Sequence, residues 1–248
     1  MSRTLLVIPH FRDTDRLAPY LKELLAVLPP EFSILISDDG SGAQEVSRLS
    51  ALIKANQASD SNSGPALLDP LLHTPNTGKG GAVVRGWDCG GDFAYLAFAD
   101  ADGAVSAAEI MRASCHLQSE QGRQDALFGS RVKMLGRSIE RTLLRHITGR
   151  VFATLVSLVS GLSAYDTQCG LKILTQPAFQ KIRPYLRCNG FAFDVEICLL
   201  LLKAKQSVAE FPLDWHDVAG SKVKILRDSI RMAVEVFKIR RRLSTVHF

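Results

Sequence analysis

Short apolar runs alternate with segments of helical periodicity along the first hundred residues. The runs TLLVIP (4–9) and FSILIS (32–37) end in a proline or an acidic turn, and leucines recur at helical spacing between 17 and 28. A further helical segment covers 45–55. Strands that alternate with helices predict an α/β fold, with a single mostly parallel sheet flanked by helices on both faces.

The rest of the chain continues this pattern less regularly. Pro70 weakens the expected strand over 66–73, because proline lacks the N–H group that a sheet uses. Residues 222–242 carry eight Lys and Arg against two acids, with apolar residues on one helical face. We therefore expect one domain over 1–222 and a basic amphipathic helix over 223–248. Further strands are expected over 92–99, 125–131 and 207–215, a loop that runs into a strand over 165–174, and helices over 80–90, 138–160 and 191–204.

The composition is that of an ordinary globular protein with a mild positive charge. A hydrophobic content of 46% and a charged content of 22% argue against global disorder. The net charge of +5 favours an anionic partner such as a phosphate, a lipid head group or a nucleic acid. Five cysteines without a Cys-x-x-Cys pair predict reduced thiols in the cytoplasm. No signal peptide is expected, and the uncharged stretch 151–165 is shorter than the roughly 20 residues of a spanning helix.

Two aspartates, Asp100 and Asp102, follow the apolar run 92–99. Ligands of parallel α/β sheets bind at the carboxyl ends of the strands. We therefore expect these carboxylates on one solvent-facing rim with those of SDDGSG (37–42). Two carboxylates at i and i+2 suit a hard divalent cation such as Mg²⁺ or Mn²⁺. A simple turn is the alternative, since Asp and Gly are common turn residues.

Two other segments indicate a nucleotide. Asp38 and Asp39 can accept hydrogen bonds from a ribose or a base, as acidic residues do in nucleotide-binding folds; capping of the next helix is the alternative. The segment PNTGKGGAV (75–83) offers glycines for close approach to a phosphate, and Lys79 adds charge at a helix N-terminus. It is not a Walker A loop, and a glycine turn with a solvated lysine is the alternative.

Arginines and acids beside apolar residues form a second group of candidates. Arg131 ends an expected strand, and Arg141 and Arg145 share a helical face beyond it. Convergent arginines bind phosphate, and a solvated basic face is the alternative. Asp166 and the acids of FDVE (193–196) would be costly next to buried aromatic rings unless they are paired or take part in function. Pairing with an arginine is their structural alternative.

In chain order, these motifs resemble family 2 glycosyltransferases. The segments VIP, SDDGS, NTGKGGAV, ADADGA, GSR, DTQCGLK, FDVE and W…GSK follow one another from about residue 5 to residue 223. The branch that they resemble most contains the dolichyl-phosphate glucosyltransferases and the dolichol-phosphate mannosyltransferases. DADGA and DTQCG are more similar to the glucosyltransferases, since the mannosyltransferases usually carry Leu-Gln where this chain has Gly103 and Ala104.

The resemblance implies a GT-A fold and an inverting, metal-dependent transfer of glucose or mannose. The donor would be a nucleotide sugar, UDP-glucose or GDP-mannose, and the acceptor a polyprenyl or dolichyl phosphate. Asp100 and Asp102 would hold Mg²⁺ or Mn²⁺, Arg131 and Arg145 would bind the acceptor phosphate, and Asp166 would be the base for a hydroxyl acceptor. The implied donor contacts are Pro9, Asp13, Asp38, Asp39, Gly78, Lys79, Gly80, Asp100, Ala101 and Asp102, and Ser221 and Lys222 would join the arginines at the acceptor.

The implied chemistry agrees with these residue types. A metal-bound diphosphate is a competent leaving group, because the cation stabilises the charge that develops. A phosphate acceptor with a second pKa of about 6 is already ionised at neutral pH and needs no strong base. The segment PHFRD (9–13) departs from the family pattern, which commonly places an aromatic residue, Asn and Glu after the first proline. Asp13 stands as the replacement for that Glu.

Contact with a membrane is expected to be peripheral and on the cytoplasmic face. The eukaryotic glucosyltransferases carry an N-terminal membrane-spanning helix, which we do not expect in this chain. The basic tail and the apolar residues 151–165 would then make the contact. Nucleic-acid binding is not expected, because no basic surface interleaved with aromatic residues occurs. A homodimer is left open.

Two other functions remain open from the sequence. In one, the donor site is the same but the acceptor is a soluble or glycan hydroxyl, and the arginines are structural. Removal of Arg131 and Arg145 distinguishes the two acceptors, because only a phosphate acceptor predicts a large loss of acceptor binding. In the other, the protein binds nucleotide without catalysis and acts as a partner or scaffold, and the altered PHFRD segment keeps this alternative open.

Overall fold

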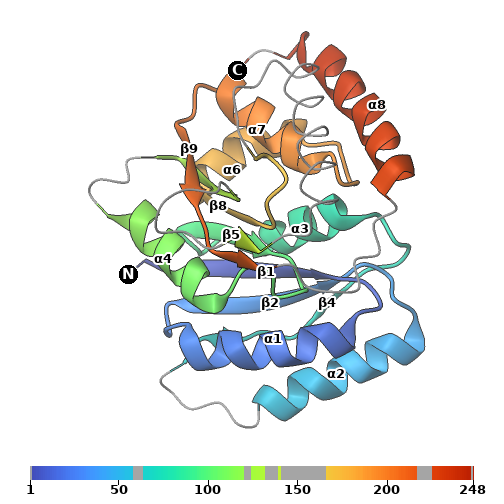
Figure 1. Ribbon diagram of the computed structural model, residues 1–248, viewed down its shortest axis with the longest axis vertical. Helices are drawn as coiled ribbons and strands as arrows, with labels where there is room; N and C mark the ends of the chain where they lie inside the picture. Colours follow the sequence, from blue (N-terminus) through green and yellow to red (C-terminus); the bar gives the residue numbers. More distant parts are fainter. Residues whose placement is uncertain are drawn as a thin grey trace.

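The computed structural model in Figure 1 describes residues 2–57, 64–119, 124–131, 139–140, 166–216, 225–246 and 248. Its main sheet has the strand order β3-β2-β1-β5-β8-β6-β9, and β4 also pairs with β2. These strands are β1 (Thr4–His10), β2 (Phe32–Asp38), β3 (Ala66–Leu67), β4 (Leu71–Leu72), β5 (Tyr95–Ala99), β6 (Ala126–Ser130), β8 (Leu171–Thr175) and β9 (Val208–Pro212).

Helices cover both faces of this sheet (Figure 1). One face carries α1 (Thr14–Val27), α2 (Ala43–Gln57) and α4 (Ala107–Gln118). The other face carries α3 (Lys79–Asp88), α6 (Gln176–Ile182), which the short turn η1 (Arg183–Tyr185) follows, α7 (Phe193–Lys203) and α8 (Ile225–Leu243).

The alternation of side chains along β1 explains the two layers. Leu5 and Val7 are buried in the core beneath α3 and α7, whereas Leu6 and Ile8 are buried in the core beneath α1 and α4. Successive side chains of a strand point to opposite faces, so a strand that is apolar throughout must be covered on both sides. The predicted α/β fold is therefore confirmed.

The sheet is mostly parallel, as expected, with one reversal. β1 pairs in parallel with β2 and β5, and β6 pairs in parallel with β9. β8 runs antiparallel to both β5 and β6. Because of this reversal, β8 begins at the rim where β5 ends, and the N–H of Asp100 donates to the carbonyl of Gly170 across 3.0 Å.

Two expected elements differ from the structure. The single strand expected over 66–73 is two short strands, β3 and β4, separated by the segment that contains Pro70. The helix expected over 138–160 does not begin as predicted, because 139–140 form strand β7 (Ile139–Glu140), which pairs with β10 (Trp215–His216) in a separate parallel sheet. Residues 141–160 lie outside the described part of the chain.

The basic C-terminal segment forms helix α8, which packs against α7. Val236, Ile239 and Leu243 are buried in the core that α7 and α3 share. The opposite face of α8 leaves Val234 and Phe237 exposed. The expected domain boundary at residue 222 stays a prediction, because 217–224 are not among the described residues.

A close contact between α3 and β1 gives a first prediction. A methyl group at Gly86 would lie 2.6 Å from Cγ1 of Val7. Overpacking of this kind costs about 1–3 kcal/mol, so Gly86→Ala lowers the free energy of unfolding by this amount in urea titrations. Gly91→Ala is the matched control, since nothing lies within 4 Å of its methyl position. Equal stability of the two variants would contradict the packing.

Candidate functional site

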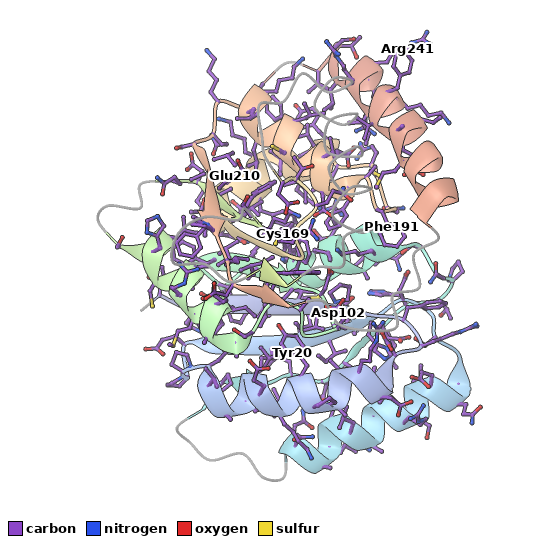
Figure 2. All side chains as sticks on the ribbon, viewed as in Figure 1. Tyr20, Asp102, Cys169, Phe191, Glu210 and Arg241 are labelled. Carbon is purple, nitrogen blue, oxygen red and sulfur yellow. The ribbon has the colours of Figure 1, made fainter. Side chains whose placement is uncertain are left out.

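A cavity of about 1170 Å³ opens at the carboxyl ends of β1 and β5. Its floor is the rim that follows these strands and the start of α3, and its far wall is the loop 187–191 with α8. Figure 2 places Asp102 at this rim, with Phe191 above it. The expected donor residues that line the cavity are Pro9, Asp13, Asp39, Gly78, Lys79, Asp100, Ala101 and Asp102.

Lys79 and Asp100 form an ion pair on the cavity floor. Lys79 Nζ lies 2.7 Å from Asp100 Oδ1, and its side chain is only 15% exposed. Burial alone would raise the pKa of Asp100, but the charge of Lys79 outweighs it and lowers this pKa. Burial likewise opposes the charge of Lys79, yet Asp100 and Asp194 raise its pKa. Both groups are therefore ionised at neutral pH.

Among the residues that the structure describes, none forms a comparable ion pair with Asp102. One of its carboxylate oxygens accepts a hydrogen bond from the N–H of Ala104 across 3.1 Å. Burial raises the pKa of Asp102, and the neighbouring charge of Asp100 raises it further. Asp100 and Asp102 together carry more negative charge than Lys79 neutralises, and one bound cation would neutralise the excess.

The donor set fits a divalent cation that keeps ligands from water and substrate. Mg²⁺ and Mn²⁺ prefer oxygen ligands, and Mg²⁺ in particular is often held by one or two carboxylates plus phosphate oxygens. Within the described residues, no group of three His, Cys, Asp or Glu side chains could hold a metal by itself. Asp100 and Asp102 would therefore supply two ligands, and the remaining ligands would come from solvent and diphosphate.

Asp39 braces the glycine segment that enters α3. Its two carboxylate oxygens accept hydrogen bonds from the N–H of Thr77 across 2.8 Å, the Thr77 hydroxyl across 3.0 Å and the N–H of Gly78 across 2.6 Å. Gly78 has φ +102°, and a Cβ there would lie 2.5 Å from the Asn189 carbonyl oxygen. Only glycine fits both the conformation and the space.

Asp38 is completely buried and does not line the cavity. It accepts hydrogen bonds from His10 Nδ1 across 2.7 Å and from the N–H and hydroxyl of Ser41. Burial opposes its ionisation, but these hydrogen bonds outweigh it and lower the pKa of Asp38. In this structure Asp38 orders the turn after β2. Gly80 does not line the cavity either, and it packs closely against the side chain of Phe193.

Arg131 and Asp166 pair with each other, and neither is among the residues that line the cavity. Arg131 Nε and Nη2 donate to the two Asp166 oxygens across 2.6 and 2.9 Å, and the N–H of Arg131 adds a bond of 3.1 Å. Burial alone would raise the pKa of Asp166, yet Arg131 lowers it. The pairing that the sequence left as an alternative is thus present. The other acceptor candidates, Arg145, Ser221 and Lys222, lie outside the described residues.

The FDVE acids are both buried and both paired. Asp194 Oδ1 lies 2.6 Å from Nζ of Lys172, a lysine with no exposed surface. Burial raises the pKa of Asp194, although Lys172 and Lys79 oppose the shift. Glu196 accepts hydrogen bonds from the N–H groups of Arg187 and Cys188 and pairs with Arg242. Glu196 therefore ties the loop 187–191 to α8.

The α8 wall of the cavity was missed by the sequence analysis. It places Lys238 and Arg242 opposite the acidic rim, and Arg187 stands beside them on the loop. The periodicity of α8 indicated an amphipathic helix, but not the surface on which it packs. The signal available in the sequence was the acid Glu196 of FDVE, which needed a cationic partner. That partner is Arg242 of α8.

Comparison with known proteins identifies the class. No family model matches the chain. A dolichyl-phosphate beta-glucosyltransferase from Saccharomyces cerevisiae is 31% identical over 94% of this chain and 73% of its own length. The Drosophila melanogaster protein of the same name is 30% identical over 94% of this chain and 73% of its own.

Among solved structures, glucosyl-3-phosphoglycerate synthase from Mycobacterium tuberculosis, in complex with Mn²⁺, UDP and glucosyl-3-phosphoglycerate, superposes with a TM-score of 0.67. The alignment covers 98% of this chain and 79% of that chain at 12% identity. The mixed sheet and its acidic rim thus define a GT-A glycosyltransferase fold. Within the family 2 glycosyltransferases, the chain belongs to the dolichyl-phosphate beta-glucosyltransferase family.

The Arg131–Asp166 pair predicts a pH-dependent stability. Because the pKa of Asp166 is lowered on folding, its contribution is full above the ordinary value of about 3.9 and is lost as the pH falls below it. Asp166→Asn therefore lowers the free energy of unfolding by about 3 kcal/mol at pH 7. In urea titrations, the difference between the free energies of unfolding of the variant and the wild type decreases towards pH 3. Asp92→Asn, at an exposed position, is the control. A difference in the free energy of unfolding that stays constant with pH would refute this contribution of Asp166.

Proposed function

We propose that the protein transfers glucose from UDP-glucose to dolichyl phosphate or another polyprenyl phosphate, with inversion at the sugar and with Mg²⁺ or Mn²⁺ as cofactor. The observation that carries the proposal is that one cavity has the Asp100–Asp102 rim on one side and the wall of α8 and the loop 187–191 on the other. On that wall the cations Arg187, Lys238 and Arg242 outnumber the one acid, Glu235. The names of the curated relatives support the acceptor and the sugar. A neighbouring structure that contains Mn²⁺ and UDP-glucose supports the donor and the metal.

The donor half of the cavity suits a nucleotide diphosphate. Asp100 and Asp102 would hold a metal that, when bound, would supply Lewis-acid stabilisation of the leaving diphosphate. Lys79 stands at the start of α3, where a cation and a helix N-terminus both favour phosphate oxygens. Pro9 and Asp39 line the same side of the cavity and offer contacts to the nucleoside. Asp13, which pairs with Arg16 on this wall, takes the place of the usual Glu.

The acceptor half favours a phosphate over a hydroxyl. A hydroxyl nucleophile needs a general base with a pKa near neutrality. Asp166, the base candidate, has a lowered pKa, uses both oxygens on Arg131 and does not line the cavity. A phosphate acceptor is ionised without a base. Arg131, Arg145, Ser221 and Lys222 remain its proposed ligands, and Arg187 and Lys238 add positive charge on the described wall.

Helix α8 also supports a peripheral position on the cytoplasmic face of a membrane. Its exposed side chains include Val234 and Phe237, and Lys238, Arg240 and Arg241 stand beside them. Arg241 lies at the outer end of the helix (Figure 2). Basic side chains next to exposed apolar ones suit an anionic lipid surface. Among the described helices, none has the length and apolar character needed to span a bilayer.

Release of UDP from UDP-glucose tests the function directly. With Mn²⁺ and a polyprenyl phosphate present, Asp102→Ala lowers kcat/KM at least about 100-fold, because the diphosphate loses a metal ligand. Asp92→Asn retains wild-type activity, since Asp92 lies beyond the other end of β5. Release that needs no lipid would point to a hydroxyl acceptor. Nucleotide binding without release would favour the scaffold.

The acceptor arginines are tested with a charge-neutral variant. Arg131→Met combined with Asp166→Asn removes the whole pair, so that no buried charge is left alone. The double variant and Arg145→Gln each raise the KM for the polyprenyl phosphate at least about tenfold, because each removes a charged contact to its phosphate. The KM for UDP-glucose stays unchanged. An unchanged KM for the lipid would assign both arginines structural roles.

A further inference from the structure

Four charged side chains of alternating sign run from the sheet core to the cavity. Lys172 Nζ is 2.6 Å from Asp194 Oδ1, and Asp194 Oδ2 is 4.0 Å from Lys79 Nζ. Lys79 Nζ is in turn 2.7 Å from Asp100 Oδ1. Lys172 and Asp194 are buried, whereas 34% of the Asp100 side chain is exposed at the cavity floor. The chain of charges therefore connects the core to one of the proposed metal ligands.

Lys79 stands between two carboxylates but contacts only one of them closely. It forms a hydrogen-bonded pair with Asp100 and leaves Asp194 about 1 Å beyond hydrogen-bond range. The rings of Phe98 and Phe193 lie 5.0 and 5.8 Å from its Nζ. Aromatic faces attract an ammonium group without fixing one hydrogen-bond direction. A small movement of Nζ between the two carboxylates thus stays within the same enclosure.

Asp194 presents one carboxylate oxygen to each of two lysines. Its Oδ1 is buried and lies 2.6 Å from Lys172 Nζ. Its Oδ2 faces Lys79. Asp194 also lies in the first turn of α7, so its position is fixed by the helix.

We propose that Asp194 is a positioning residue that receives the Lys79 ammonium group when a divalent cation takes the Asp100 carboxylate. In the protein alone, Lys79 occupies the place of the cation on Asp100. The incoming metal must displace it, and Asp194 offers the displaced charge a partner inside the cavity. Lys79 then remains beside the diphosphate. This inference rests on the proposed metal-dependent transfer and adds an ion-pair exchange to it.

Direct Mn²⁺ binding tests the exchange without catalysis. Free Mn²⁺ is measured by electron paramagnetic resonance during titration of the full chain with MnCl₂, with and without UDP. The charge-neutral variant Lys172→Met/Asp194→Asn removes the receiving carboxylate together with its core partner. It weakens Mn²⁺ binding about tenfold, because Lys79 is left with Asp100 alone, whereas Lys79→Met tightens binding by a similar factor.

The decisive comparison is the triple variant. With Lys79→Met present, addition of Lys172→Met/Asp194→Asn leaves Mn²⁺ affinity unchanged, because the displaced group is gone. A tenfold loss in both backgrounds would show that Asp194 acts only through the structure of the core, and would overturn the exchange. Absence of Mn²⁺ binding in all variants, with UDP present, would instead overturn the metal dependence itself.

A crystal structure of the wild-type protein with Mn²⁺ and UDP gives a second test that needs no variant. Lys79 Nζ is expected within about 3 Å of Asp194 Oδ2 and out of contact with Asp100. Lys79 still paired with Asp100 beside a bound metal would overturn the exchange. Glucose transfer by the same preparation reports separately on the proposed function.

Discussion

The antiparallel contact between β5 and β8 is the constraint on which the site depends. β8 begins where β5 ends, so the backbone of Gly170 lies against Asp100. A Cβ at Gly170 would lie 2.5 Å from Asp100 Oδ2, and only glycine permits this approach. The same reversal carries Lys172 under the rim, where it meets Asp194. The acidic rim and the buried charges behind it are therefore products of one strand reversal.

The sequence predicted the elements whose pattern is local. β1, β2 and β5 are continuous apolar runs, and α1 repeats leucine at helical spacing. It did not predict α4 or α6. The Ser106 cap, which accepts from the N–H of Glu109, was a local signal for α4 that went unused. Helix α6 is 7 residues long, too short for its periodicity to stand out.

The site was predictable where a motif follows a strand, because parallel strands bring their carboxyl ends to one edge. This rule predicted the carboxylates of Asp100 and Asp102 on one rim with those of residues 37–42, and Asp39, Asp100 and Asp102 do line one cavity. It could not place α8, whose position depends on packing against α7 over a long sequence separation. It also could not distinguish Asp39, which lines the cavity, from its neighbour Asp38. The carboxylate of Asp38 is buried and accepts hydrogen bonds from His10 and Ser41.

The cavity joins residues from opposite ends of the chain. Pro9 and Phe11 line one side, and Ile239 and Arg242 line another. During synthesis the chain emerges from its N-terminus, so the acidic rim can form well before the wall that faces it. The nascent protein therefore has an open, solvated rim until α8 has left the ribosome. Only then does the low-dielectric enclosure exist in which the charges at the rim interact strongly.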